Sequence, residues 1–280
     1  MTYKTVLVIL QSQVDAKRVL DFALPFAARH GSHVIGLHAE ALPMPVVSPM
    51  GGPAIDFNTA LQEDTLRRHQ ELKRFFGERA EAEGVAHEWR SYDNVSGDSA
   101  VSGIEIARTA DLVIALQNDP DADSLRSSDL EALLFRTGRP LLLVPYTFSG
   151  RSEPFKKAVL AWNGSKEAAR AVFDALPLLR EAGRAEVLSV DARDTMDQDA
   201  EMAGAAIAQS LARHGIDVTL SAEQSNGLSH DEVIANHIAE ANADLLVMGA
   251  FGRSRLAEFV FGGVTRKMLQ SMTTPTLLSH

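Results

Sequence analysis

Glycines, arginines and a threonine gather near the C-terminus in the stretch GAFGRSRLAEFVFGGVT, residues 249–265. Glycine weakens strands and helices, so this clustering needs a local reason. The stretch follows the strand-like run ADLLVM and precedes the helix-like run VTRKMLQSM. The first turn of a helix offers unpaired N–H groups and a partial positive charge, and glycine lets a phosphate approach closely. With the Thr265 hydroxyl and the Arg253 charge, the stretch is typical of a phosphate-binding loop; the alternative is a glycine-rich connection without a ligand.

The chain lacks the signatures of the common enzymes that use such loops. The glycine pattern is neither G-x-G-x-x-G nor a Walker loop with its Lys-Ser/Thr pair. Ser165 has no His/Asp partner by motif, and no residue presents itself as a general base. The nine histidines fit no metal-binding spacing. We therefore expect a binding site without a catalytic or metal centre, and slow hydrolysis of a bound nucleotide stays open.

Composition narrows the class of protein further. The 280 residues carry a formal net charge of −10, which argues against broad binding to nucleic acids or acidic membranes. The chain has no Cys, so disulfides and Cys-based zinc sites are excluded. The apolar run at the N-terminus, VLVIL, is too short for a signal-peptide core or a membrane span. We expect a soluble, cytoplasmic protein.

The chain contains one pattern twice. KTVLVILQS (4–12) resembles KAVLAWNGS (157–165), and each is followed by a helix-period segment that ends in glycine, Gly31 or Gly183. ARTADLVIAL (107–116) parallels AEANADLLVMG (239–249). The stretch TFSGRSEP reads as a linker because it is rich in Ser, Gly and Pro. We predict two units, residues 1–148 and residues 154–280.

Strands and helices alternate within each predicted unit. Short Val/Ile/Leu-rich runs between helical stretches predict an α/β fold, a parallel sheet with helices on both faces. In such sheets ligands bind beyond the carboxyl ends of the strands. In the first unit we expect strands at 4–10, 33–39, 85–92, 111–117 and 140–145, and helices at 15–30, 59–83, 98–109 and 127–137; the second unit repeats this order from Lys157.

The spacing of Gly249, Gly252 and Gly262, Gly-x2-Gly-x9-Gly after a fourth strand, resembles the ATP-binding motif of the universal stress protein family. The resemblance covers the whole chain as two tandem units, with the motif complete only in the second. It implies Rossmann-like or flavodoxin-like units, each with a five-stranded sheet, that bind ATP or AMP across the carboxyl edge, with Mg²⁺ possible beside ATP. It also implies a stress-response regulator.

The resemblance assigns roles to residues of the second unit. The end of the first strand and the turn after it would contact the nucleoside, and Val190 would line the adenine pocket. The fourth strand would open onto the nucleotide at Met248 and Gly249, and the loop and helix start would cradle the phosphates. The implied binding residues are Ala161, Trp162, Asn163, Ser165, Val190, Met248, Gly249, Gly252, Arg253, Gly262, Gly263, Val264 and Thr265. The alternative without a ligand is that Val190, Met248 and Trp162 only pack in the protein core and that Ser165 is a helix N-cap.

Two positions depart from the family pattern. Asn163 stands where members that bind nucleotide usually have Asp, so an acceptor is kept and the charge is lost. Gly263 stands where the family often has Ser, so a hydroxyl is lost while the backbone N–H remains. With Asn163, binding could survive with the purine edge or the ribose hydroxyls contacted differently. The change at Gly263 weakens the expected binding of a triphosphate more than the expectation of binding itself.

The first unit fails the same comparison. Leu10 stands at the position assigned to Asn163, and the counterpart of the glycine loop is LQNDPDADSLRSS (116–128), without glycine and rich in Asp. Carboxylates repel phosphate, by about 1 kcal/mol per close pair even in a water-like dielectric. We predict that this unit binds no nucleotide and pairs with the second unit as an internal pseudo-dimer. A cation on NDPDAD is the alternative; a solvated acidic loop is favoured because the Gly and distal Glu of a calcium loop are missing.

Two further interpretations of the function stay open at this point. Both units could be degenerate scaffolds that bind protein partners without any ligand, or the second unit could hydrolyse ATP slowly. The sequence also leaves open whether the tandem chain forms a homodimer. The interpretation that the residues favour is an adenine-nucleotide-binding regulator.

Overall fold

A computed structural model of the 280-residue chain describes residues 2–41, 54–94, 96–121, 128–192, 204–250 and 263–280. Within those ranges no helix is long and apolar enough to cross a membrane. The predicted binding residues Gly252, Arg253 and Gly262 lie outside the described residues, as do residues 122–127 of the acidic loop.

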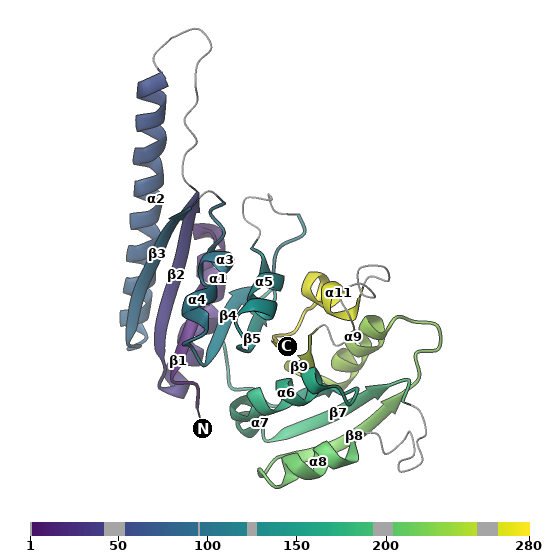
Figure 1. The fold of residues 1–280 in the computed structure, drawn as a ribbon. Coiled ribbons are helices and arrows are strands. Elements are labelled where there is room, and N and C mark those ends of the chain that lie inside the picture. Colours follow the sequence, from purple (N-terminus) through teal and green to yellow (C-terminus); the bar gives the residue numbers. More distant parts are fainter. Residues whose placement is uncertain (1, 42–53, 95, 122–127, 193–203, 251–262) are drawn as a thin grey trace.

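Within the described residues, ten strands form one continuous sheet in the order β3-β2-β1-β4-β5-β10-β9-β6-β7-β8 (Figure 1). Neighbouring strands are parallel except β5 and β10, which pair antiparallel. The strands are β1 (Thr5–Ile9), β2 (His33–Ala41), β3 (His87–Asn94), β4 (Leu112–Leu116), β5 (Leu141–Val144), β6 (Ala158–Ala161), β7 (Arg184–Val190), β8 (Asp217–Glu223), β9 (Leu245–Gly249) and β10 (Thr276–Ser279).

The strand order shows two equivalent halves. The first half comprises β1–β5 with order 3-2-1-4-5, and the second half comprises β6–β10 with the corresponding order 8-7-6-9-10. The α/β fold with helix-covered parallel sheets, predicted from the sequence, is confirmed. The structure adds that Leu141–Leu143 of β5 pair with Thr276–Leu278 of β10, so the two five-stranded sets become one sheet. Because this pairing is antiparallel, the carboxyl edges of the two halves face opposite ways at the seam.

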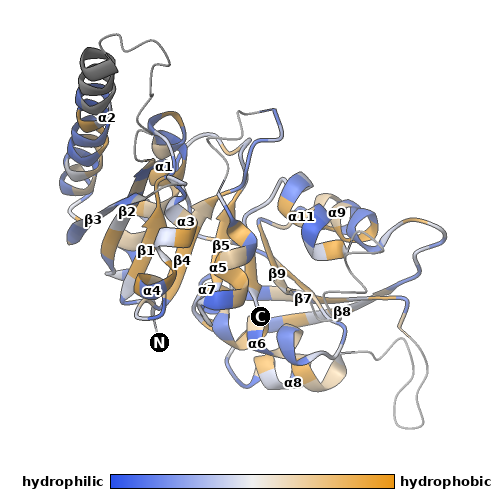
Figure 2. Ribbon diagram, turned by 45° about the horizontal axis from the view of Figure 1, so that its top comes forward, coloured by the Kyte–Doolittle hydropathy of each residue, from blue (hydrophilic) through white to orange (hydrophobic). Residues whose placement is uncertain are grey.

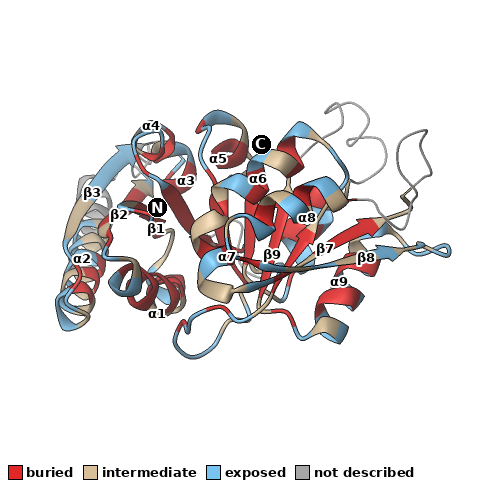
Figure 3. Ribbon diagram, turned by 90° about the horizontal axis from the view of Figure 1, so that it is seen from below, coloured by how far each residue is buried: buried red, intermediate tan, exposed pale blue. Residues whose placement is uncertain are grey.

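Helices cover both faces of the sheet. Alternate strand residues feed two separate apolar cores, which is why both faces need a cover (Figures 2 and 3). On one face lie α1 (Gln13–His30), α2 (Ala54–Ala82), α6 (Lys166–Asp174), α7 (Leu176–Ala182) and α8 (Ala205–Ala212). On the other lie α3 (Ser99–Ser102), α4 (Ile104–Ala107), α5 (Leu130–Arg136), α9 (His230–Ala241) and α11 (Val264–Ser271).

The predicted N-cap at Ser165 and the predicted stops at Gly31 and Gly183 are confirmed, and α1 begins two residues before its predicted start with a cap at Ser12. Ser12 caps α1 by accepting the N–H of Asp15, and Ser165 caps α6 by accepting the N–H of Ala168. Gly31 ends α1 with φ 60° and Gly183 ends α7 with φ 70°, a backbone region that favours glycine.

Two predicted helices are divided in the structure. The helix predicted over 98–109 becomes α3 and α4, which meet at Gly103. A Cβ at Gly103 would lie 2.6 Å from Leu37 Cδ2, so glycine lets this segment pack directly on the sheet. The counterpart of α1 is likewise divided into α6 and α7, with Pro177 in the first turn of α7. In α1 the helix continues through Pro25.

Side chains fasten the halves together beside the β5–β10 seam. The Tyr3 hydroxyl donates to the Asp174 carbonyl oxygen at 2.7 Å, so the segment before β1 contacts the end of α6. Glu181 of α7 lies 3.0 Å from His30 Nε2 and 3.5 Å from Arg29 Nε, both on α1. These contacts join helices of the two halves on one face of the sheet and suit an internal pair of units.

Candidate functional site

The strand ends of the second half bring several predicted site residues to one carboxyl edge. Ala161 ends β6 and pairs with Leu188 of β7 on one side and with Met248 of β9 on the other. The N–H of Trp162 donates to the Leu188 carbonyl oxygen at 2.8 Å, which carries the chain past the end of β6 next to β7. Val190 ends β7, so the residues assigned to the nucleoside lie on three adjacent strands.

The turn after β6 is held by its own side chains. The Asn163 side-chain oxygen accepts the N–H of Ser165 at 3.0 Å, and Gly164 between them has φ +72°. Ser165 Oγ accepts the N–H of Ala168 at 3.1 Å, which confirms the N-cap interpretation. Asn163 and Gly164 are exposed, and Trp162 is half-buried against the core. The turn therefore presents an amide side chain at the edge above a capped helix.

Gly249 has a packing reason that the sequence did not reveal. A Cβ at Gly249 would lie 2.4 Å from the Ala168 nitrogen and 2.5 Å from the Glu167 carbonyl carbon. Both are backbone atoms of the first turn of α6, which cannot give way as a flexible side chain could. Glycine at the end of β9 thus lets α6 begin directly against the sheet. The packing of α6 therefore requires the first glycine of the motif, whether or not that glycine also contacts a ligand.

The start of α6 is already neutralised by a protein carboxylate. Glu167, in the first turn, is 5% exposed, and its Oε1 lies 3.4 Å from Lys166 Nζ. Burial alone would raise the pKa of Glu167, but a backbone N–H and its Lys166 and Ser165 neighbours outweigh burial and lower that pKa. The partial positive charge of this helix end therefore faces an ionised group of the protein itself.

The start of α11 differs, because its N-cap residue has no side chain. Gly263 precedes the helix with φ −52° and ψ 150°, and Val264 and Thr265 form its first turn. Thr265 is buried at 3% exposure, and Val264 packs against the core of that face. Since α11 precedes β10, it begins at the same carboxyl edge at which β6, β7 and β9 end. The backbone N–H groups at Gly263–Thr265 thus stand where the sequence predicted a phosphate cradle.

A cluster that the sequence analysis missed borders this edge. Asp191 directly follows β7 with φ +52°, and its Oδ1 accepts the N–H of Ser225 at 2.8 Å. Its Oδ2 lies 2.9 Å from Nε2 of His230, the first residue of α9. The hydrogen bond from the Ser225 N–H, aided by His230, lowers the pKa of Asp191. An Asp immediately after the run VLSV was the available signal, because polar residues at strand ends line such edges.

The first half shows which residue corresponds to Asn163. Asp111 accepts the N–H of Lys4 at 2.7 Å, and Asp244 accepts the N–H of Lys156 at 2.8 Å, so the two lysines are equivalent. Gln11 follows Lys4 at the same spacing at which Asn163 follows Lys156, so Gln11 is the counterpart of Asn163. The predicted counterpart, Leu10, was wrong. The cause is one extra residue, Gly164, before the capping serine of the second half.

Gln11 closes the carboxyl edge of the first half. Its Nε2 donates to the Gly97 carbonyl oxygen at 2.9 Å, and its Oε1 accepts the N–H of Ser99 at 2.8 Å. The Ser128 hydroxyl donates to the same Oε1 at 3.1 Å. One amide therefore ties together the end of β1, the start of α3 and the approach to α5.

Carboxylates occupy the helix start that corresponds to α11. Asp129, the N-cap of α5, accepts the N–H of Ala132 at 2.8 Å. Asp98, the N-cap of α3, accepts the N–H of Asp129 at 2.9 Å through its second oxygen. Two N–H groups at the start of α5, those of Asp129 and Ala132, are thus bonded to carboxylates of the chain. The counterpart of Asp129 in the second half is Gly263.

The chemistry that this arrangement offers is binding. Ser165 Oγ serves as a helix cap, and the carboxylates of Glu167 and Asp191 are paired with groups of the chain itself. Among the described residues, no group of three or more His, Asp or Glu side chains is arranged to hold a metal ion. The amide of Asn163 and the helix start at Gly263, whose N-cap carries no charge, suit a ligand with an anionic end.

A comparison with known protein families finds a match in the second half of the chain. Residues 154–280 match the sequence model of the universal stress protein family. No curated protein sequence matches the chain.

Solved structures match the chain over its whole length. A universal stress protein from Archaeoglobus fulgidus is 17% identical with a TM-score of 0.72, over 98% of this chain and 95% of that one. A putative universal stress protein from Pseudomonas aeruginosa UCBPP-PA14 is 17% identical with a TM-score of 0.55, over 99% of this chain and 93% of that one. A functionally unknown protein from P. aeruginosa PAO1 is 18% identical with a TM-score of 0.56, over 99% and 92%. At these identities the likeness establishes the fold.

Proposed function

We propose that the second half, whose residues 154–280 match the sequence model of the universal stress protein family, binds an adenine nucleotide, ATP or AMP, at the carboxyl edge. The phosphates would lie at the N–H groups of Gly263–Thr265, and the nucleoside would lie across the ends of β6, β7 and β9 near Asn163, Val190 and Met248. The predicted residues Gly252, Arg253 and Gly262 would complete the phosphate loop, with Mg²⁺ accompanying ATP.

The observation that carries the proposal is the difference between the two equivalent helix starts. At α5 the chain supplies Asp129 and Asp98 as its own anions. At α11 it supplies Gly263, and the family match falls on this half alone. A phosphate at α11 would take the place that a carboxylate holds at α5, and a helix N-terminus favours either one.

We propose a regulator of the stress response whose signal is nucleotide occupancy. A nucleotide across this edge would bridge β6, β9 and α11 and stabilise the bound form in proportion to its concentration. A partner protein could then distinguish the bound form from the free one. Slow ATP hydrolysis is tested by following phosphate release, and the proposal requires turnover no faster than background.

The test is equilibrium binding of ATP and of AMP to the wild-type chain and to two Gly263 variants. Gly263→Asp copies the N-cap of α5 and places a negative charge at the phosphate position. Its φ of −52° is open to any residue, so the variant should fold. Like charges about 4 Å apart cost about 1 kcal/mol in water-like and about 4 kcal/mol in protein-like surroundings, so affinity should fall at least about fivefold.

Gly263→Ser is the matched control, because it adds a side chain and a hydroxyl without charge. Its affinity should equal or exceed that of the wild type. Asn163→Asp, which restores the usual family residue, should retain binding as well. Equal affinities of Gly263→Asp and the wild type would place the site elsewhere. No binding by the wild type at millimolar nucleotide would leave the ligand-independent scaffold as the better interpretation.

A further inference from the structure

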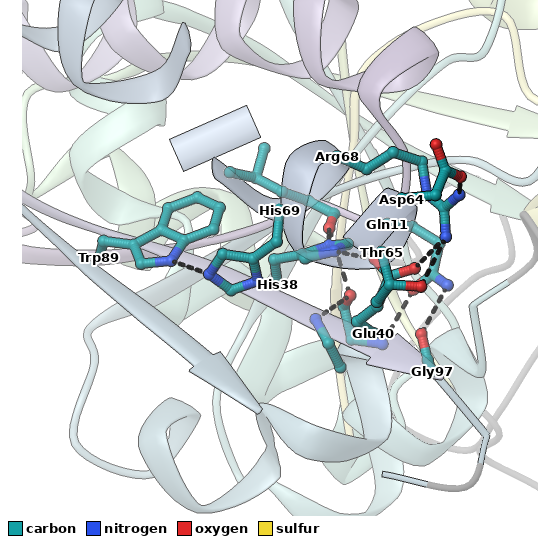
Figure 4. A network of polar contacts seen from close by, with 12 residues as sticks. Gln11, His38, Glu40, Asp64, Thr65, Arg68, His69, Trp89 and Gly97 are labelled. Carbon is teal, nitrogen blue, oxygen red and sulfur yellow. Dashed lines mark hydrogen bonds and ion pairs between the residues drawn. The ribbon is translucent and has the colours of Figure 1, made fainter. Parts of the chain in front are cut away.

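A polar network in the first half, away from the proposed nucleotide site, joins α2 to the strands β2 and β3 (Figure 4). His38 of β2 is 5% exposed, and both of its ring nitrogens face acceptors. Nδ1 lies 2.7 Å from the Leu10 carbonyl oxygen, and Nε2 lies 2.9 Å from Glu40 Oε2. A carbonyl and a carboxylate can only accept, so both nitrogens must donate, which is the imidazolium form.

Glu40 extends the network to α2. Arg68 of α2 donates through Nη2 to Glu40 Oε1 at 3.0 Å and also pairs with Asp64 one turn earlier. Burial would raise the pKa of Glu40, but hydrogen bonds from His38 and Arg68 outweigh burial and lower it. The carboxylate therefore stays ionised between two cations and holds α2 to β2.

A second histidine holds α2 to β3 in the opposite protonation state. The indole Nε1–H of Trp89 faces His69 Nε2 at 3.4 Å, and the two rings meet edge to face with centroids 5.7 Å apart. Trp89 can only donate, so His69 Nε2 accepts and the ring is neutral. The centroids of His38 and His69 are 5.8 Å apart, so a charged and a neutral imidazole are neighbours.

We propose that His38 and His69 form a pH-sensitive latch that holds α2 against β2 and β3 and opens when His69 takes up a proton. A protonated His69 would turn an N–H toward the Trp89 N–H and would place a second cation beside His38. Both effects remove attraction between α2 and the strands.

The charged groups around His69 act in both directions. Burial lowers the pKa of His69, and the nearby charge of His38 lowers it further. Asp93 of β3 and Glu40 of β2 raise it, and Lys73 of α2 lowers it. The net lowering means that a detached α2, with an ordinary histidine, binds the proton more readily. Falling pH therefore favours the open latch.

The test uses the full chain with Trp162→Phe, so that Trp89 is the remaining tryptophan. From pH 8 to pH 5, Trp89 emission should change as the pH passes below about 6.5, the ordinary histidine value. Amide exchange over 63–82, corrected for its intrinsic rate, should increase about tenfold per pH unit below that point until closed His69 also titrates. Far-UV circular dichroism should show that the fold is retained.

Two histidine variants separate the latch from a general acid effect. His69→Gln keeps an acceptor for Trp89 but cannot titrate, so the emission change should disappear. His33→Gln, at the start of β2, is the matched control and should keep the emission change. A transition that persists in His69→Gln would overturn the proposal.

Nuclear magnetic resonance of the wild-type chain tests the same point without any variant. The His69 ring should be neutral at pH 7.5, and the Trp89 indole N–H signal should shift with the same midpoint as His69. A Trp89 signal that does not follow His69 would overturn the latch even if His69→Gln failed to fold.

Discussion

The two carboxyl edges of this molecule are built on the same strand order and satisfy their helix starts in opposite ways. In the first half Gln11 ties three segments together, and Asp98 and Asp129 bond the N–H groups at α5. In the second half the equivalent positions hold an exposed Asn163 and the side-chain-free Gly263. The comparison teaches that one fold can place its own carboxylates at this helix start or place there a residue without a side chain.

Small changes in the chain separate the two outcomes. The turn after β6 has one residue more than the turn after β1, and it contains Gly164 with φ +72°. At the ends of the fourth strands, Leu116 in the first half corresponds to Gly249 in the second. Each difference moves the first helix of the half relative to the sheet edge, and the side chains follow.

The largest effect should come from removing the glycine that lets α6 approach the sheet. Gly249→Ala would put a methyl group 2.4 Å from the Ala168 nitrogen, and displacing the helix should cost about 2–3 kcal/mol of unfolding free energy. Urea denaturation measures this cost. Leu116→Met, a volume-conserving change at the equivalent position, should cost less than about 1.5 kcal/mol. If Gly249→Ala and Leu116→Met cost the same unfolding free energy, α1 and α6 would approach the sheet equally closely.

Gln11→Ala should show an intermediate effect. It removes three hydrogen bonds and leaves a partly buried N–H at Ser99 and a carbonyl at Gly97, for a cost of about 1–3 kcal/mol. Asn163→Ala removes one bond at an exposed turn and should cost less than about 1 kcal/mol. The comparison of urea midpoints checks both values. A larger loss for Asn163 would contradict the view that only the first half closes its own edge.

The smallest effect should be a difference in acid sensitivity between Glu40, near the end of β2, and Asp191, directly after the equivalent strand β7. The pKa of each is lowered, Asp191 chiefly by the Ser225 N–H and Glu40 by hydrogen bonds that outweigh its burial. Each carboxylate therefore stabilises the fold above its unfolded value, near pH 4, and that stabilisation is lost as the pH falls through the lowered pKa. The dependence of stability on pH between pH 7 and pH 3 should flatten more in Glu40→Gln than in Asp191→Asn, because the side chain of Asp191 is 36% exposed and that of Glu40 is 16% exposed.

The sequence predicted what depends on local pattern. Strand and helix alternation, the cap at Ser165 and the stops at Gly31 and Gly183 each follow from a few neighbouring residues, and the structure has them. The repeat of the pattern predicted two equivalent halves, although the division at residues 148 and 154 stays a prediction.

The rest depends on contacts between segments far apart in the sequence. The β5–β10 pairing joins runs more than a hundred residues apart, and nothing local to either run specifies it. Leu10 was matched to Asn163 because the sequence does not show which strand residues are paired. Gly249 was assigned to a ligand because the approach of α6 is visible only in three dimensions. The roles of the predicted nucleotide contacts stay predictions.

The central claim is that the second half alone binds an adenine nucleotide, and calorimetric titration of the wild-type chain with ATP and with AMP tests it most directly. The account predicts one nucleotide per chain, with an affinity at least about fivefold lower in Gly263→Asp but not in Gly263→Ser. Two nucleotides per chain, or one that Gly263→Asp still binds with wild-type affinity, would contradict it.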